Sequence, residues 1–149
     1  MHRSARLTAS IAVCVFATTL VVAQPLDGRS AASAGQAAAV EVTVNARLTG
    51  WVARRDGYHL YVAGATVRTP VVVWPNLHGE KVWARLEWRR PGRAWAMLDA
   101  SAVRLNLDSR GLFLVRGLPQ GYAFRIRARV PARNGHQASR SGWRYFRVG

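Results

Sequence analysis

Three arginines alternate with apolar residues in the stretch YAFRIRARV, residues 122–130. Successive side chains of a β-strand point to opposite faces, so Arg125, Arg127 and Arg129 would share one face. Guanidinium groups bind phosphate and carboxylate through paired, charge-assisted hydrogen bonds. The stretch therefore predicts a strand with one cationic face that is suited to anionic groups.

Two flanking stretches would extend this face. Residues 81–92, KVWARLEWRRPG, and residues 143–148, WRYFRV, also alternate, and each places aromatic and basic residues on one parity. Aromatic rings beside guanidiniums can stack on sugars or bases. The predicted polyanion-binding residues are Arg85, Arg89, Arg125, Arg127, Arg129 and Arg147, with Trp83, Trp143 and Tyr145 for stacking.

A second interpretation is that contacts within this face balance its own positive charges, so that no ligand is needed. Neighbouring arginines about 7 Å apart on one strand face repel by only about 0.6 kcal/mol in water. One cation–π stack on Trp83 or Trp143, at about 0.5–1 kcal/mol, offsets this. Glu87 lies among the arginines and is expected to pair with them. Self-stacking and anion binding are compatible.

Exposed tryptophans could instead form a carbohydrate platform. The candidates are Trp51, Trp83, Trp95 and Trp143, whereas Trp74 and Trp88 are assigned to the core by their parity. For any single tryptophan, a buried structural role is the competing interpretation.

Catalysis has little support in the sequence. Asp56, Glu80 and Asp108 lie in predicted turns, which leaves few carboxylates for an acid and base pair. His59, His78 and His136 have no metal-ligand spacing, and no phosphate-binding loop occurs. We expect no enzyme, no metal and no cofactor.

The beginning of the chain has the features of a secretory signal peptide. Arg3 and Arg6 precede an uncharged span from Leu7 to Val22, and small residues precede Gln24. We predict a signal-peptide helix over residues 1–23 that is cleaved near Ala23; if it is not cleaved, it would anchor the chain in a membrane. Residues 24–39 are rich in Ala, Gly and Ser and predict a flexible linker.

Residues 40–149 alternate with a period of two nearly throughout, with frequent turn residues and no convincing helical period. Alternating segments include 40–44, 58–62, 82–88, 103–107, 112–115, 122–130 and 143–148. The only cysteine, Cys14, lies in the predicted leader, so the domain would fold without disulfides. The pattern predicts an all-β, antiparallel β-sandwich of seven or eight strands.

Residues 71–149 resemble a fibronectin type III domain, or the immunoglobulin-like modules of secreted bacterial proteins. The resemblance rests on LVRGLPQGYAFRIRARVPARNGHQASRSGWRYFRVG, where Leu and Pro precede a Tyr, and on VWARLEWRRPGRAWAML. It implies Greek-key topology, Tyr122 as a tyrosine corner, and Phe124, Ile126 and Ala128 in the core. It also implies that strand 122–130 lies between strands 81–90 and 143–148. The long segment from Val40 to Pro70 is expected to add a strand.

The formal net charge of +15 would attract polyanions over long distances. We therefore expect a non-catalytic binding or adhesion module, secreted or associated with the cell envelope, whose partner is an anionic polysaccharide or another envelope polymer. A carbohydrate-binding module and a structural or protein-partner domain are the alternatives. Nucleic acid is a less favoured partner, and a membrane is one only if the leader is retained.

Overall fold

The computed structural model describes residues 38–149, which contain ten β-strands and no helix. None of these residues belongs to a helix long and apolar enough to cross a membrane. The predicted signal peptide lies outside the described residues, as does all of the predicted linker except Ala38 and Ala39. The strands are β1 (Thr43–Ala46), β2 (Ala53–Arg55), β3 (Tyr58–Tyr61), β4 (Val67–Trp74), β5 (Lys81–Arg89), β6 (Ala96–Arg104), β7 (Arg110–Val115), β8 (Ala123–Val130), β9 (Ser139–Arg140) and β10 (Arg144–Val148).

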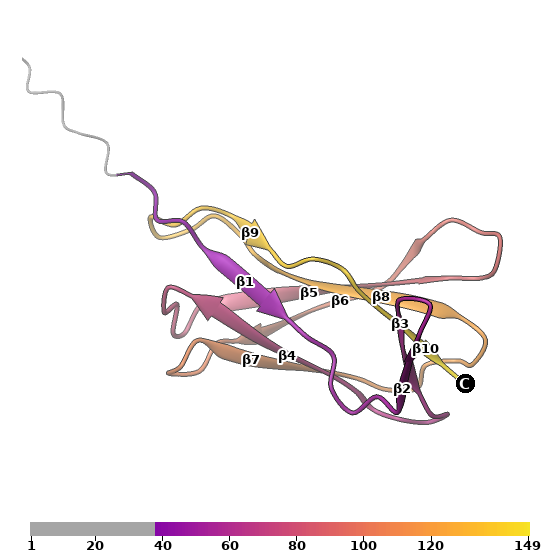
Figure 1. The fold of residues 1–149 in the computed structure, drawn as a ribbon. Helices are drawn as coiled ribbons and strands as arrows, with labels where there is room; N and C mark the ends of the chain where they lie inside the picture. Colours follow the sequence, from indigo (N-terminus) through magenta and orange to yellow (C-terminus); the bar gives the residue numbers. More distant parts are fainter. Residues whose placement is uncertain (1–37) are drawn as a thin grey trace, which may run out of the picture. The chain divides into compact units, whose positions relative to one another are not determined.

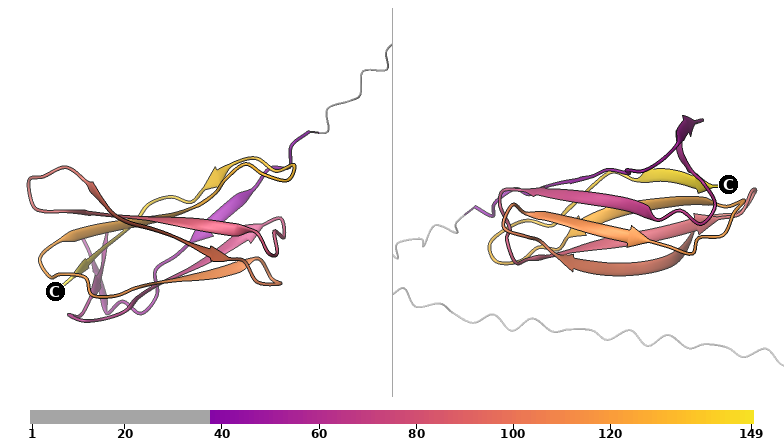
Figure 2. Two further views of the ribbon diagram at one scale, coloured as in Figure 1. Left: turned by 180° about the vertical axis from the view of Figure 1, so that it is seen from behind. Right: turned by 90° about the horizontal axis from the view of Figure 1, so that it is seen from below.

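The strands form two sheets that pack against each other (Figure 1). The small sheet has the order β1-β4-β7, and the large sheet has the order β2-β3-β10-β8-β5-β6, with β9 paired to β8. The views in Figure 2 show both sheets running along the length of the body. The prediction of an all-β sandwich is confirmed at this level.

The core lies between the sheets and follows the alternation of the sequence. Phe124, Ile126 and Ala128 of β8 are buried, as expected, and Phe124 stacks on Phe146 of β10 with ring centroids 5.3 Å apart. The small sheet contributes valines and Phe113 from its inward face. Since a buried side chain of this kind contributes about 1.5–3 kcal/mol, the two-residue period determines which face of each strand turns inward.

Strand β8 lies between β5 and β10, as the resemblance implied. Trp83, Arg85 and Glu87 of β5 pair with Arg129, Arg127 and Arg125 of β8, respectively. On the other side, Tyr145 of β10 pairs with Arg125. Directly paired residues point to the same face of a sheet, so the outward side chains of the three strands form one continuous surface.

The segment before β4 adds a hairpin, β2 and β3, rather than one strand. Asp56 and Gly57 connect the two strands with φ angles of 49° and 79°, and positive φ at both positions is typical of a type I′ hairpin turn. Strand β3 then pairs in parallel with β10, which is an exception to the expected antiparallel sheets. In the right-hand view of Figure 2 the dark purple hairpin stands out from the body beside the C-terminal strand.

Two assignments made from parity are wrong. Trp74 was expected in the core, but it is 72% exposed, because Val71 and Val73 are the inward residues of β4. The predicted strand over 103–107 begins earlier, at Ala96, and ends at Arg104, so Leu107 is exposed. Trp88 is half-buried and packs against the core, as expected. Strand number also exceeds the predicted seven or eight, since the hairpin and the short β9 are additional.

Candidate functional site: a cationic sheet face

Five side chains on the outer face of the large sheet form a continuous stack of alternating guanidinium groups and indole rings. The guanidinium carbon of Arg89 lies 4.6 Å from the ring centroid of Trp95, and that of Arg125 lies 4.6 Å from the same ring. Arg125 is also 4.3 Å from the ring of Trp143, and Arg127 is 4.4 Å from it. We call this series, Arg89-Trp95-Arg125-Trp143-Arg127, the stacked ladder.

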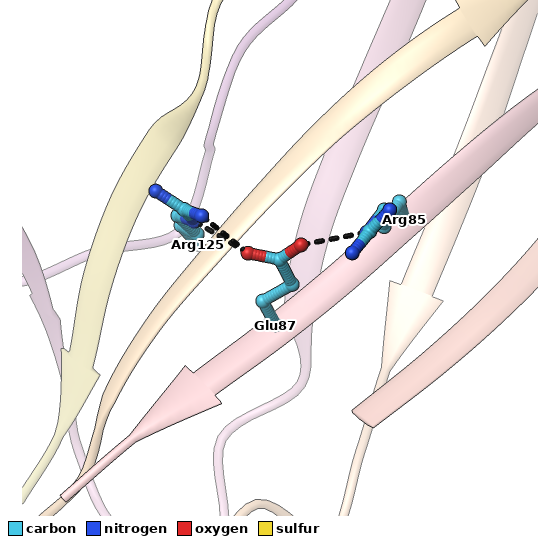
Figure 3. Close-up of polar contacts among 3 residues, drawn as sticks. All are labelled: Arg85, Glu87 and Arg125. Atoms are coloured by element: carbon cyan, nitrogen blue, oxygen red, sulfur yellow. Dashed lines mark hydrogen bonds and ion pairs between the residues drawn. The ribbon is translucent and has the colours of Figure 1, made fainter. Parts of the chain in front are cut away.

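The stacked ladder is held to the sheet by one carboxylate. Glu87 Oε1 lies 2.6 Å from Arg85 Nε, and Glu87 Oε2 lies 2.5 Å from Arg125 Nη2 (Figure 3). Arg125 Nε donates a further hydrogen bond of 2.7 Å to Oε2. Glu87 is only 3% exposed, so its charge is held in a low-dielectric position between two guanidiniums. The expected pairing of Glu87 with the arginines is confirmed.

The extra hairpin closes one end of the stacked ladder. Tyr58 of β3 accepts a 3.0 Å hydrogen bond at its hydroxyl from Arg89 Nη2. The guanidinium carbon of Arg147 lies 4.2 Å from the Tyr58 ring centroid, and the Tyr145 ring makes an edge contact with Tyr58. Arg89 and Arg147 are therefore engaged by the protein itself.

At its other end, the stacked ladder stops at Arg127, and a different kind of surface begins. Arg129 pairs across the sheet with Trp83 and with Arg140, while Lys81 pairs with Arg104. Because these residues are paired directly, their side chains share the outer face. We define the open patch as Lys81, Trp83, Arg104, Arg129 and Arg140.

The open patch is accessible, and none of its basic side chains is ion-paired within residues 38–149, although Glu80 lines a small pocket together with Lys81 and Arg104. Trp83 is 46% exposed, and its neighbour on β6 is the small residue Ala102. Within residues 38–149, no carboxylate forms an ion pair with Arg129, Arg140 or Lys81. The outer face therefore has two parts: the stacked ladder, whose arginines contact aromatic rings and Glu87, and the open patch, whose positive charges form no ion pair.

Arg127 lies at the boundary between the two parts. Burial lowers the pKa of its guanidinium from the ordinary value, and the positive charges of Arg140 and Arg85 lower it further, although Glu87 opposes this effect. The lowered pKa means that the local environment disfavours the charge of Arg127. An anion bound beside it would relieve this repulsion.

The sequence-predicted residues fall into three groups. Arg125, Arg89, Arg147 and Trp143 are stacked within the protein, and Tyr145 contacts the rings of Tyr58 and Trp95. Arg85 is half exposed and paired with Glu87. Arg127 is partly exposed and is stacked on Trp143 at the end of the stacked ladder, whereas Arg129 and Trp83 are exposed. Their roles in binding stay predictions.

Sequence reasoning did not assign Trp95, Tyr58, Arg140, Lys81 or Arg104 to this face. Trp95 precedes β6 in a connecting loop, where strand alternation cannot predict the direction of a side chain, and Tyr58 belongs to the added hairpin. Arg140 lies in the segment SRSGW, so its pairing with Arg129 could have been inferred only from the register of the last strands.

The exposed tryptophans do not form one platform. Trp51 precedes the hairpin, Trp74 ends a strand of the small sheet, and Trp83 lies on β5 of the large sheet. Trp95 and Trp143 have guanidiniums stacked on their rings. Side by side stacking of several sugars on these rings has no geometric support.

The other polar groups of the described residues make no recognisable catalytic arrangement. No three His, Cys, Asp or Glu side chains within residues 38–149 come together in a metal-binding group. His59 contacts the backbone carbonyl of Tyr145 through Nδ1 at 3.3 Å, and its ring makes an edge contact with Trp51. His136 is buried, at a bridge with Val40.

No model of a known protein family matches the chain, and no curated protein matches it.

Proposed function

We propose that residues 40–149 are a non-catalytic binding or adhesion module that captures anionic polymers on the open patch, with Arg127 and Arg85 at its border. The observation that carries this proposal is a cluster of basic side chains around an exposed indole, none of which forms an ion pair with a carboxylate of residues 38–149. Guanidiniums of this kind grip phosphate or carboxylate groups, and Trp83 offers a surface on which a sugar ring can stack.

The stacked ladder has a supporting role in this proposal. Arg89 and Arg125 are held in place by aromatic rings and by Tyr58 or Glu87, away from the open patch, so they give the patch rigidity rather than binding groups; Arg127, at the end of the stacked ladder, is stacked on one ring only. A rigid sheet presents the open patch in one arrangement, which lowers the ordering cost of binding. The proposed site is therefore narrower than the sequence prediction, because it excludes Arg89, Arg125 and Arg147.

For the fold, we infer Greek-key topology of the fibronectin type III or bacterial immunoglobulin-like type. Support comes from the position of β8 between β5 and β10, and from the half-buried Tyr122, whose ring contacts Trp88 and Phe124. The hairpin β2 and β3 would be an addition to that topology.

The proposed location is outside the cell or in the cell envelope, on the strength of the signal-peptide features of residues 1–23. The proposed partner is an anionic polysaccharide or another anionic envelope polymer. The proposed location and the proposed partner are consistent with each other, because envelope polymers are abundant polyanions that an exported basic protein meets.

The test is binding of the full chain to heparin as the anionic probe, measured over a range of salt concentrations. Binding to a polyanion weakens linearly on a logarithmic salt scale, and the slope reports the number of contacts made by basic groups. In a variant with Arg127, Arg129 and Arg140 changed to Ala, we expect at least tenfold weaker binding at low salt and a shallower slope, by about one for each lost contact.

The matched control removes the same charge from the other sheet. Arg47, Arg68 and Arg110 are exposed on the outer side of the small sheet, and their triple change to Ala should alter binding less than threefold. Equal losses in the two triple variants would show that only net charge matters and would overturn the proposed site. Salt-insensitive binding to neutral glycans that Trp83→Ala abolishes would instead establish the carbohydrate-binding alternative, and a copurifying protein with no polymer binding would favour a partner domain.

A further inference from the structure

A pocket lies at the opposite end of the stacked ladder from the open patch. It has a volume of about 680 Å³ and lies between β3, β10, the start of β8, and the turn that follows β5. Pockets that bind small organic ligands commonly have volumes of about 300–1,000 Å³. This volume suits a ligand the size of a substituted ring better than a polymer.

The charged residues of the pocket are three arginines. Arg89, Arg93 and Arg147 all line it, and no Asp or Glu side chain is among the lining residues. These arginines come from two parts of the chain: Arg89 and Arg93 from the end of β5 and the turn that follows it, and Arg147 from β10. Their convergence predicts a site for a compact anionic group, because each guanidinium can donate paired hydrogen bonds.

Two of these guanidiniums are already held in place. Tyr58 accepts a hydrogen bond from Arg89, and its ring lies under the guanidinium of Arg147. A hydrogen bond to one nitrogen and a stacked face leave other donor groups of each arginine free. Binding would therefore order few side chains, and a pre-ordered site loses less free energy to immobilisation.

The remaining walls of the pocket are largely apolar. Leu60, Pro91, Tyr122 and Val148 line it together with the backbone of Gly121 and Gly149. An inorganic anion alone would leave this apolar surface in contact with water. A ligand that carries a planar or apolar body next to its anionic group would cover it and gain about 25 cal/mol for each Å² buried.

We propose that this pocket binds a small organic anion, in which a phosphate or carboxylate group contacts Arg89, Arg93 and Arg147 and an apolar body lies against Tyr122 and Leu60. The site is separate from the open patch, and the proposal does not depend on polymer binding there. The extra hairpin gains a role in this arrangement, since Tyr58 positions two of the three arginines.

The probe is phenyl phosphate, titrated into the full chain by calorimetry or by NMR chemical shifts. Inorganic phosphate lacks the ring, and benzyl alcohol lacks the charge, so each should bind at least fivefold more weakly. The main variant is Arg93→Ala. Arg93 lies in an exposed turn, where its backbone N–H donates to the Arg90 carbonyl, so the change leaves the turn's hydrogen bond intact.

We expect Arg93→Ala and Arg147→Ala each to weaken phenyl phosphate binding about tenfold, and Arg147→Lys to restore it only in part, because lysine lacks the planar fork. Arg54→Ala, an exposed arginine of β2 outside the pocket, is the matched control and should have no effect. The triple variant of Arg127, Arg129 and Arg140 should also bind phenyl phosphate normally. Unchanged binding in Arg93→Ala, or equal binding of benzyl alcohol, would overturn the proposal.

Discussion

Glu87 and Arg125 form a two-point ion pair across β5 and β8, with Glu87 Oε2 2.5 Å from Nη2 and 2.7 Å from Nε of the arginine. The pair fixes the plane of the guanidinium, and that plane lies between the rings of Trp95 and Trp143. One buried carboxylate thereby determines the position of the central member of the stacked ladder.

The first prediction concerns that carboxylate. Glu87→Gln should lower the free energy of unfolding by about 2 kcal/mol, because it leaves Arg125 and Arg85 without their shared counterion. The loss should be smaller than for a fully buried ion pair, because Arg85 is half exposed and water can solvate its charge. Urea unfolding monitored by tryptophan fluorescence measures the change. Asp56→Asn is the control, since the pair of Asp56 with Arg55 spans 3.7 Å at an exposed turn and should contribute less than about 0.5 kcal/mol. A Glu87→Gln loss as small as the control's would contradict this account of the ion pair.

A second prediction tests the packing between the sheets. A Cβ at Gly111 of β7 would lie 2.8 Å from Val103 Cγ2 and 3.4 Å from Val82 Cγ1. Gly111→Ala should therefore destabilise the fold by about 1–3 kcal/mol through overpacking. Gly142→Ala is matched to it, since nothing lies within 4 Å of a Cβ there, and it should be neutral within about 0.5 kcal/mol. Thermal unfolding of the two variants compares them directly, and equal midpoints would rule out close contact at Gly111.

A third prediction concerns alkaline pH. Burial raises the pKa of Tyr61 from 10.0 to about 12, and its hydroxyl donates a 3.0 Å hydrogen bond to the Thr49 carbonyl. Because the folded-state pKa is above the unfolded one, the stabilisation is complete below pH 10 and is lost as pH rises to about 12. The free energy of unfolding should fall by about 1.4 kcal/mol for each pH unit in this window.

Tyr61→Phe keeps the ring against Phe146 and removes the ionisable group. In urea unfolding at a series of pH values from 9 upward, this variant should lack that part of the decline, and a tyrosinate absorbance step near pH 12 should disappear. A variant with the same alkaline slope as the unmodified protein would refute the assignment to Tyr61.

The orientation of the strands on either side of the core could be predicted because polar and apolar residues alternate there. In β8, Phe124, Ile126 and Ala128 alternate with the arginines, and a slip by one residue would bury three charges. The alternation fails as a guide in VVVW, residues 71–74. Four consecutive apolar residues do not show which of them face the core, and the core position predicted for Trp74 is wrong.

The cationic face was predicted only as a surface, without its division into two parts. Periodicity identifies the face of each strand, but it does not identify loop residues that cover that face. Trp95 comes from a loop and Tyr58 from the added hairpin, and these two rings engage arginines that the sequence left free. The identity of the accessible arginines therefore depended on tertiary contacts.

The parallel pairing of β3 with β10 restricts the order in which the strands of the large sheet can pair during folding. Phe146, Arg147 and Val148 are the partners of His59, Leu60 and Tyr61, and the Gly149 amide donates to the Tyr61 carbonyl. During synthesis the early hairpin has no docking strand until β10 has emerged. A nascent chain that stalls before residue 144 would thus expose an unpaired sheet edge, and the ring of Tyr61 would lack Phe146, its contact in the core.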